Sequence, residues 1–270
     1  MRLQALRLVG VAELGHQLHR NRSSPHFHKL LPHLRLLSEK DAAAIQVGES
    51  SPIDQETNKI FELLAACWVL PLVSDIELDD PDESAGGTNP DIIATIAGVR
   101  WGIACKVLHS RNPLQLLSTV EKGISQVGAA QVDRGLVIVS MKNRLDINDY
   151  WPFSSPIEAS SPDPEFLCFI DENVPFAMLR AQLTDFVLDA KRSAGQAALE
   201  SILVKPKIVP AIVMWGHTIS PVLLEGNSVI TSVRSLVVTS ISEQPGKALR
   251  PDDRAFLVAL NDSAMTNPEP

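Results

Sequence analysis

The stretch Asn89–Ser110, NPDIIATIAGVRWGIACKVLHS, carries the clearest fold signal in the chain. It reads as two short apolar strands joined at Gly98 and bounded by turn-forming residues. Each strand holds one ionisable residue that an ordinary hairpin does not need: Asp91 opens the first strand and Lys106 interrupts the second. A lysine in an apolar strand is costly without a negative partner. The stretch therefore predicts a hairpin in which an acid and a lysine come together.

The segments on either side of this hairpin predict an α/β fold. A helix is expected from about 55 to 70, a strand over 72–78, a helix over 113–132 and a fully apolar strand over 135–140. The second hairpin strand, the helix after it and the apolar strand form a β-α-β crossover, so the two strands should pair in parallel. The predicted order is helix, three strands, helix, strand.

The rest of the chain is expected to add helices and strands to this core. Residues 1–45 and 174–201 show helical spacing, 207–224 and 228–241 read as strands, and a helix-start signature opens 251–265. Loops are expected over 79–90 and 150–166, which are rich in proline and acids. We expect one domain over 1–265: an N-terminal helical extension (1–54), the core (55–142) and a C-terminal addition of helix and strands (143–265). A disordered tail would follow at 266–270.

Composition favours a globular cytoplasmic protein. The 270 residues are 45% hydrophobic, which can fill a core, and the net charge of -8 means that binding of a polyanion needs a local basic surface. The three cysteines lie in separate apolar runs and fit neither a disulfide framework nor a zinc site. Charges interrupt the apolar N-terminus, and no stretch is long enough to span a bilayer. A soluble protein in a reducing compartment is expected.

One glutamate stands out in the helix before the hairpin. In IFELLAACWVL, Glu62 is the only charged or strongly polar side chain, so it should be at least partly buried and should need a cation or several donors. One interpretation is a structural ion pair with Lys59, Lys106 or an arginine elsewhere. Gln126 adds a polar group to a helix of small and apolar residues. With Asp91, these groups are expected to converge around one sheet.

This layout resembles the PD-(D/E)XK, or restriction-endonuclease-like, nuclease superfamily. That superfamily has a glutamate in a first helix, Pro-Asp opening a strand, a lysine on the next strand and a glutamine in the following helix. The matching residues are Glu62, Pro90 with Asp91, Lys106 and Gln126. The resemblance covers about 55–142 and implies an α/β fold with an αβββαβ core, in which helices flank a mixed central sheet. Because Pro-Asp pairs are common, the interpretation rests on the agreement of order, spacing and predicted elements.

The resemblance implies a DNA endonuclease that uses Mg²⁺ or Mn²⁺, in restriction or defence against foreign DNA. Phosphodiester hydrolysis needs a metal that holds the phosphate, a nucleophilic water and positive charge against the developing oxyanion. By resemblance, Asp91 would be a direct metal ligand and Glu62 a second or water-mediated one. Lys106 would position the water, and Gln126 would organise the site or contact phosphate. A homodimer is a further implication, because a duplex has two strands to cut.

One position departs from the superfamily pattern. Two residues before the lysine the superfamily has Asp or Glu, whereas this chain has Ala104, whose methyl group cannot bind a metal. Glu62 or Glu121 would replace the acid from a helix, or Asp91, the Cys105 backbone carbonyl and waters would hold Mg²⁺. Alternatively the site is catalytically silent, and the fold serves nucleic-acid binding or protein assembly. A structural charge network in an unrelated α/β domain is a further alternative.

Basic residues after the second hairpin strand predict a surface for the nucleic-acid backbone. The candidates for nucleic-acid binding are His109, Arg111 and Lys122. Further positive charge comes from Arg134, Lys142 and Arg144. A merely solvated basic face is the alternative interpretation.

Several other side chains are assigned to packing. Strand alternation turns Cys105 away from Lys106, which predicts a packed thiol rather than a nucleophile. Trp101, Trp151 and Trp215 are expected to pack in the core or against loops. The N-terminal histidines lack further ligands at metal-binding spacing, so solvated or capping roles are expected.

Overall fold

A six-stranded mixed sheet forms the centre of the protein. The computed structural model describes residues 2–39, 55–81, 89–110, 112–141, 144–151, 168–241 and 247–266. The strands lie in the order β1-β2-β3-β4-β5-β6. They span Asp75–Leu78, Ile92–Ile96, Val99–Val107, Arg134–Ser140, Ala211–Leu224 and Asn227–Ser240. Neighbours pair antiparallel except β3 with β4 and β4 with β5, which are parallel. The predicted α/β class is confirmed.

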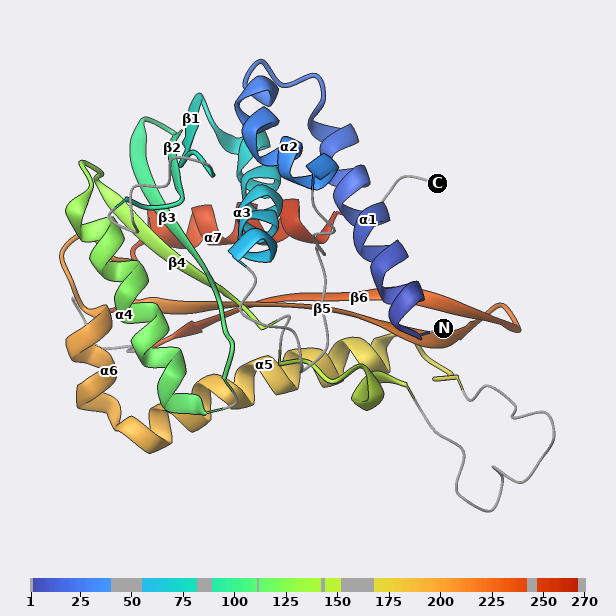
Figure 1. The fold of residues 1–270 in the computed structure, drawn as a ribbon. Coiled ribbons are helices and arrows are strands. Elements are labelled where there is room, and N and C mark those ends of the chain that lie inside the picture. Colours follow the sequence, from blue (N-terminus) through green and yellow to red (C-terminus); the bar gives the residue numbers. More distant parts are fainter. Residues whose placement is uncertain are drawn as a thin grey trace.

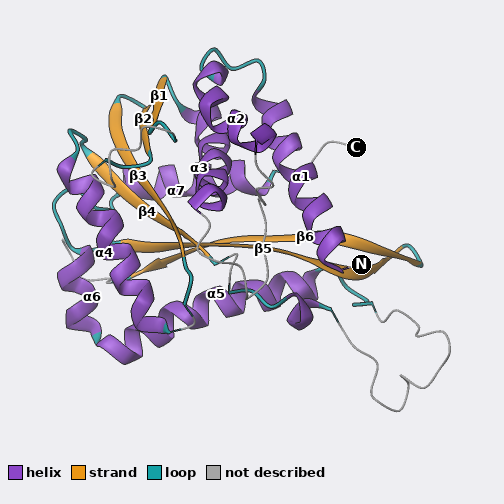
Figure 2. Cartoon of the chain, in the orientation of Figure 1, coloured by secondary structure: helices purple, strands orange, loops and turns teal. Residues whose placement is uncertain are grey.

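Helices cover both faces of this sheet (Figure 1). On one face lie α1 (Arg2–Asn21), α2 (Leu31–Glu39), α3 (Gln55–Val69) and α7 (Pro251–Met265). On the other lie α4 (Pro113–Ala129), α5 (Asn173–Ala194) and α6 (Gln196–Leu203). Short 3-10 helices occupy Phe27–Leu30, Leu70–Leu72 and Ile147–Tyr150. Figure 2 shows the resulting three layers, helix, sheet and helix.

The predicted hairpin is β2 and β3. Its two-residue turn holds Ala97 at φ 48° and Gly98 at φ 78°, as in a type I′ turn, whose backbone matches the twist of the strands. Glycine adopts this conformation without penalty, whereas Ala97 is strained in it. The strand predicted over 72–78 begins only at Asp75, because a 3-10 turn containing Pro71 continues α3 through Leu72.

The predicted β-α-β crossover is also present. β3 and β4 pair in parallel from Trp101 opposite Arg134 to Val107 opposite Ser140. Between them runs α4, which Asn112 caps by accepting a 3.0 Å hydrogen bond from the Leu114 N–H. Asn112 thus starts the helix where the strand has ended.

Two apolar cores lie on the two faces of the sheet. One joins α3 and α7 to the strands, and in it the Trp68 and Trp215 rings lie 4.5 Å apart while Trp101 packs 4.3 Å from Phe256. The other lies under α4, α5 and α6. The core positions expected for Trp101, Trp151 and Trp215 are confirmed, since all three side chains are buried.

Some expectations concern residues outside the described ranges. Most of the predicted loops at 79–90 and 150–166, the end of the segment 1–45 and nearly all of the tail 266–270 lie there. Among the described residues, no helix combines the length and the apolar character that crossing a membrane requires.

Candidate active site

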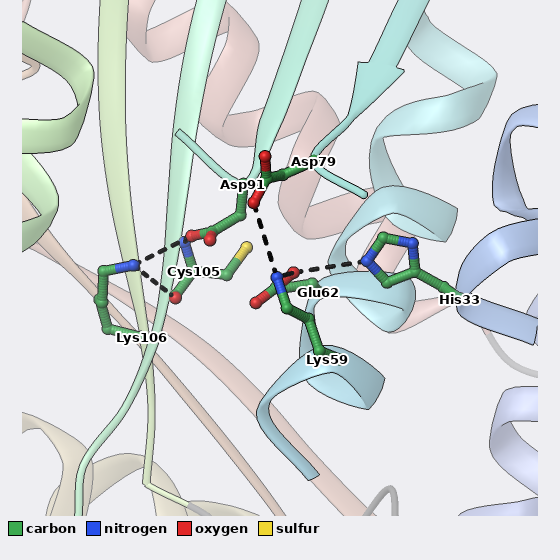
Figure 3. Close-up of polar contacts among 7 residues, drawn as sticks. All are labelled: His33, Lys59, Glu62, Asp79, Asp91, Cys105 and Lys106. Carbon is green, nitrogen blue, oxygen red and sulfur yellow. Dashed lines mark hydrogen bonds and ion pairs between the residues drawn. The ribbon is translucent and has the colours of Figure 1, made fainter. Parts of the chain in front are cut away.

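The candidate site lies where β3 continues beyond the start of β2. Pairing between the two strands stops at Ile92 opposite Ile103, so the next backbone groups of β3 on that side have no partner in β2. Asp91 fills this place: its Oδ2 accepts hydrogen bonds from the Cys105 N–H at 2.6 Å and from Lys106 Nζ at 3.0 Å. Lys106 Nζ also donates to the Cys105 carbonyl at 3.1 Å. The acid and the lysine therefore meet directly (Figure 3).

Glu62 enters the same region from α3. Its Oε2 lies 2.9 Å from Lys59 Nζ and 3.4 Å from His33 Nε2, and its side chain is only 6% exposed. A buried glutamate that needs a cation was expected, and Lys59, one turn earlier on α3, is that cation. Lys59 Nζ also lies 3.8 Å from Asp79 Oδ2, just after β1. Figure 3 shows Glu62 between the Asp91 group and His33.

The charges of Asp91, Glu62 and Lys59 influence one another. Burial and the nearby Glu62 charge raise the pKa of Asp91, against the lowering effect of Lys106 and the Cys105 N–H. Burial opposes the charge on Lys59, but Glu62, Asp91 and Asp79 together outweigh it and raise the pKa of the ammonium. The region thus disfavours two ionised carboxylates and favours cations.

The oxygen atoms at this site are of the kind that a magnesium ion binds. The donors are the Asp91 and Glu62 carboxylates and the Cys105 carbonyl, all of them hard oxygens. Among the described residues, the hydrogen bonds and ion pairs of the two carboxylates are made by Asp91 Oδ2 and Glu62 Oε2, and none is made by their second oxygens, Asp91 Oδ1 and Glu62 Oε1. Over the same part, no group of three or more His, Cys, Asp or Glu side chains is placed to hold a metal. An ion that keeps several waters and needs one or two carboxylates matches this set.

Ala104, which stands where the superfamily pattern has Asp or Glu, lies in an enclosed position. Ala104 is fully buried in the core beneath α4, and a Cβ placed on Gly123 would lie 3.2 Å from the Ala104 Cβ. Glu121 is exposed, and residues two apart on a helix point in nearly opposite directions, so Glu121 faces away from Ala104. Of the two helix acids considered as replacements, only Glu62 lies at the site.

Gln126 lies on the buried face of α4. Its Oε1 has no hydrogen-bond partner among the described residues. An unpaired amide oxygen in a buried position is energetically unfavourable. No hydrogen bond in the described structure joins it to Asp91, Glu62 or Lys106. Its role as an organiser or phosphate contact therefore stays a prediction.

Only part of the basic surface predicted after β3 lies among the described residues. Lys122 is exposed and His109 is half-buried, whereas Arg111 and Lys142 lie outside the described residues. The inclusion of Arg134 was wrong. Its side chain is buried, its Nε donates to Asp253 Oδ1 at 2.9 Å, and a second hydrogen bond joins the same two groups. Arg144 is partly buried and has an interaction partner.

Two members of the site, His33 and Asp79, were not predicted, and no pattern in the sequence marks them. His33 is one of the N-terminal histidines, for which solvated or capping roles were expected, and this expectation was wrong for His33, which is fully buried. The packing of α2 against α3 brings it to Glu62. Asp79 lies in a loop of several acids, and its N–H donates to the Asp91 carbonyl at 3.0 Å. The predicted packed thiol of Cys105 is confirmed, since Cys105 is buried in the core beneath α3 and burial raises its pKa.

Comparisons of the chain with protein-family models, with curated proteins and with solved structures gave no match. The functional interpretation therefore depends on the geometry of the site.

Proposed function

We propose that this protein is a metal-dependent nuclease that hydrolyses DNA phosphodiester bonds. The observation that carries the proposal is that Asp91 and Lys106 contact each other at the open end between β2 and β3, and that Glu62, from α3, is near enough for its charge to raise the pKa of Asp91. A buried charge pair alone is common in proteins. A second buried carboxylate that raises the pKa of the first is unfavourable for the fold and is characteristic of functional sites.

The order of elements supports the proposal. From α3 onward the chain runs helix, three antiparallel strands, helix, and a strand parallel to the third. This agrees with the αβββαβ order of the restriction-endonuclease-like core that the sequence resembles.

Asp91, Glu62 and the Cys105 carbonyl would hold the Mg²⁺. A bound Mg²⁺ supplies positive charge to the phosphate and a water of lowered pKa. The Lys106 side chain is 19% exposed and is fixed by its hydrogen bonds to Asp91 and the Cys105 carbonyl. Its ammonium can therefore position a water or contact a phosphate oxygen at the rim of the site.

Contact with DNA would be confined to one area of the surface. With a net charge of -8 the whole molecule repels a polyanion, so nearby basic groups must hold the backbone. Lys122 is exposed on α4, the helix that follows β3. His109 lies just beyond the end of β3 and is the second described candidate.

The test is cleavage of supercoiled plasmid DNA with Mg²⁺ or Mn²⁺, with EDTA as the metal-free control. Asp91→Asn and Lys106→Met should abolish cleavage, whereas Lys29→Met removes a lysine charge from an exposed position and should not. Parallel reactions with single-stranded DNA and RNA define the substrate. Cleavage that survives in Asp91→Asn and Lys106→Met would reject the proposed site.

A catalytically silent nuclease-fold module is the second candidate. The enclosed Ala104 favours it, and so does the ion pair that Lys59 forms with Glu62. This candidate predicts DNA binding in gel-shift assays that is unchanged by Mn²⁺ and by Asp91→Asn, without cleavage. Metal-dependent cleavage by the wild-type protein would exclude it.

A further inference from the structure

Lys59 is the cation nearest to the candidate metal ligand Glu62. Its Nζ lies 2.9 Å from Glu62 Oε2, and its side chain is 17% exposed, so the ammonium is close to solvent as well as to the carboxylate. The contact is not demanded by the backbone, because it joins two side chains one turn apart on α3.

We propose that Lys59 is an internal competitor of the metal ion, which keeps Glu62 neutralised and weakens divalent cation binding until the cation displaces the ammonium. This inference rests on the proposed function, because it concerns the same site. Its physical basis is that an ammonium and a divalent cation repel each other when both lie beside one carboxylate. The observed contact therefore opposes occupancy of Glu62 by a metal.

Asp79 gives the displaced ammonium an alternative partner. Its Oδ2 already lies 3.8 Å from Lys59 Nζ, and its own side chain is 16% exposed (Figure 3). A small rotation of the lysine side chain would exchange Glu62 for Asp79 without leaving the charge unpaired. Lys59 would thus move between two acids, and Asp79 would assist metal binding without contacting the metal.

General electrostatics also predicts that removing a lysine strengthens cation binding, so single variants do not suffice. The exchange of partners makes a stronger prediction, because Asp79 acts only through Lys59. Asp79→Asn should weaken Mn²⁺ binding in the wild-type background and should have little effect in the Lys59→Met background. Independent charge effects would instead add in the double variant.

The experiment measures Mn²⁺ binding to the full chain without DNA, by the loss of the free-Mn²⁺ electron paramagnetic resonance signal, with thermal unfolding as a second readout. Lys59→Met should bind Mn²⁺ roughly tenfold more tightly, the change expected from removing one charge a few ångströms from a divalent ion in a hydrated site. Lys59→Arg keeps the charge and should stay near the wild type. Lys29→Met is the matched control for loss of an exposed lysine, and it should not alter binding.

The outcomes separate this inference from the proposed function. If the wild type binds Mn²⁺ and Lys59→Met binds it no more tightly, the competitor role is wrong while the metal site stands. Additive effects of Asp79→Asn and Lys59→Met would also overturn the exchange between two acids. If neither the wild type nor Lys59→Met binds Mn²⁺, the metal-dependent function itself is rejected. Circular dichroism of each variant confirms that the fold is intact.

Discussion

Replacing Asp91 by asparagine tests whether its negative charge serves function or the fold. Burial and Glu62 raise the pKa of Asp91 above its ordinary value of 3.8, despite Lys106 and the Cys105 N–H. The folded protein therefore binds the Asp91 proton more tightly than the unfolded chain does. It follows that the ionised carboxylate lowers stability increasingly as the pH rises from 3.8 through the raised pKa. At neutral pH the charge is a cost to folding.

The geometry sets the expected magnitudes. In Asp91→Asn the amide oxygen remains as an acceptor for the Cys105 N–H, and the raised pKa of Asp91 already includes the attraction of Lys106, which burial and Glu62 outweigh. Removing the buried charge raises the free energy of unfolding at neutral pH by about 1.4 kcal/mol for each unit by which the pKa of Asp91 is raised. Asp91→Asn should therefore leave the free energy of unfolding within about 1 kcal/mol of the wild type, or raise it. Asp91→Ala leaves the Cys105 N–H without its acceptor and should lose about 1–3 kcal/mol relative to the asparagine variant.

The assay is urea unfolding at pH 7 followed by circular dichroism, with plasmid cleavage measured on the same preparations. Both variants should be inactive, but only Asp91→Ala should be less stable. Any gain from Asp91→Asn should disappear in acid below pH 3.8, where the wild-type carboxyl is protonated in both states. A loss as large for asparagine as for alanine would show that the charge holds the fold together, and the functional reasoning would fail.

Three further perturbations test other parts of the structure. Burial and Arg234 lower the pKa of His217 to about 3, so the free energy of unfolding falls as the pH drops below the ordinary histidine pKa of 6.5. In urea unfolding the wild type should lose about 2 kcal/mol between about pH 7 and pH 5, and His217→Gln should not show this loss. The same pH profile in both proteins would contradict this. A Cβ on Gly123 would lie 2.8 Å from a valine methyl of β4, whereas one on Gly128 meets nothing within 4 Å. In thermal unfolding, Gly123→Ala should therefore lower stability by about 1–3 kcal/mol, and Gly128→Ala should raise it by up to about 1 kcal/mol. Equal shifts in melting temperature for the two variants would refute the close approach at Gly123. Without metal, Ala104→Glu should be destabilised by several kcal/mol, because the new carboxylate enters the core beneath α4. If the new acid reaches the site, Mn²⁺ should restore part of the lost stability. A melting temperature that does not respond to Mn²⁺ would favour the silent module.

The core of the fold was predictable because its signals are local. The β2–β3 hairpin needs a turn at Gly98, and its alternation decides which side chains share a face. The parallel pairing of β3 with β4 follows from one helix placed between two apolar strands. The meeting of Asp91 with Lys106 was then expected, since a lysine in a buried strand needs a nearby acid.

Contacts between elements that lie far apart in the sequence could not be predicted in the same way. Arg134 read as surface charge, and only the packing of α7 brings Asp253 to it. The α2–α3 packing likewise places His33 against Glu62, although many buried polar pairs would satisfy that glutamate equally well. Such pairings depend on which faces of distant elements meet, and neither the periodicity nor the spacing of one segment contains that information.

Glu62 is the residue that best separates a functional site from a structural charge network. Asp91 and Lys106 have a structural purpose, because they satisfy the N–H and the carbonyl of Cys105 where β3 has lost its neighbour β2. Glu62 satisfies no backbone group among the described residues. It contacts Lys59 and His33, and its charge makes ionised Asp91 less favourable. An apolar residue at position 62 would remove this penalty, but it would leave Lys59 and the buried His33 Nε2 without their contact to Glu62. The metal-ligand role proposed for Glu62 gives its charge a purpose that these two contacts, which a neutral acceptor could also make, do not require.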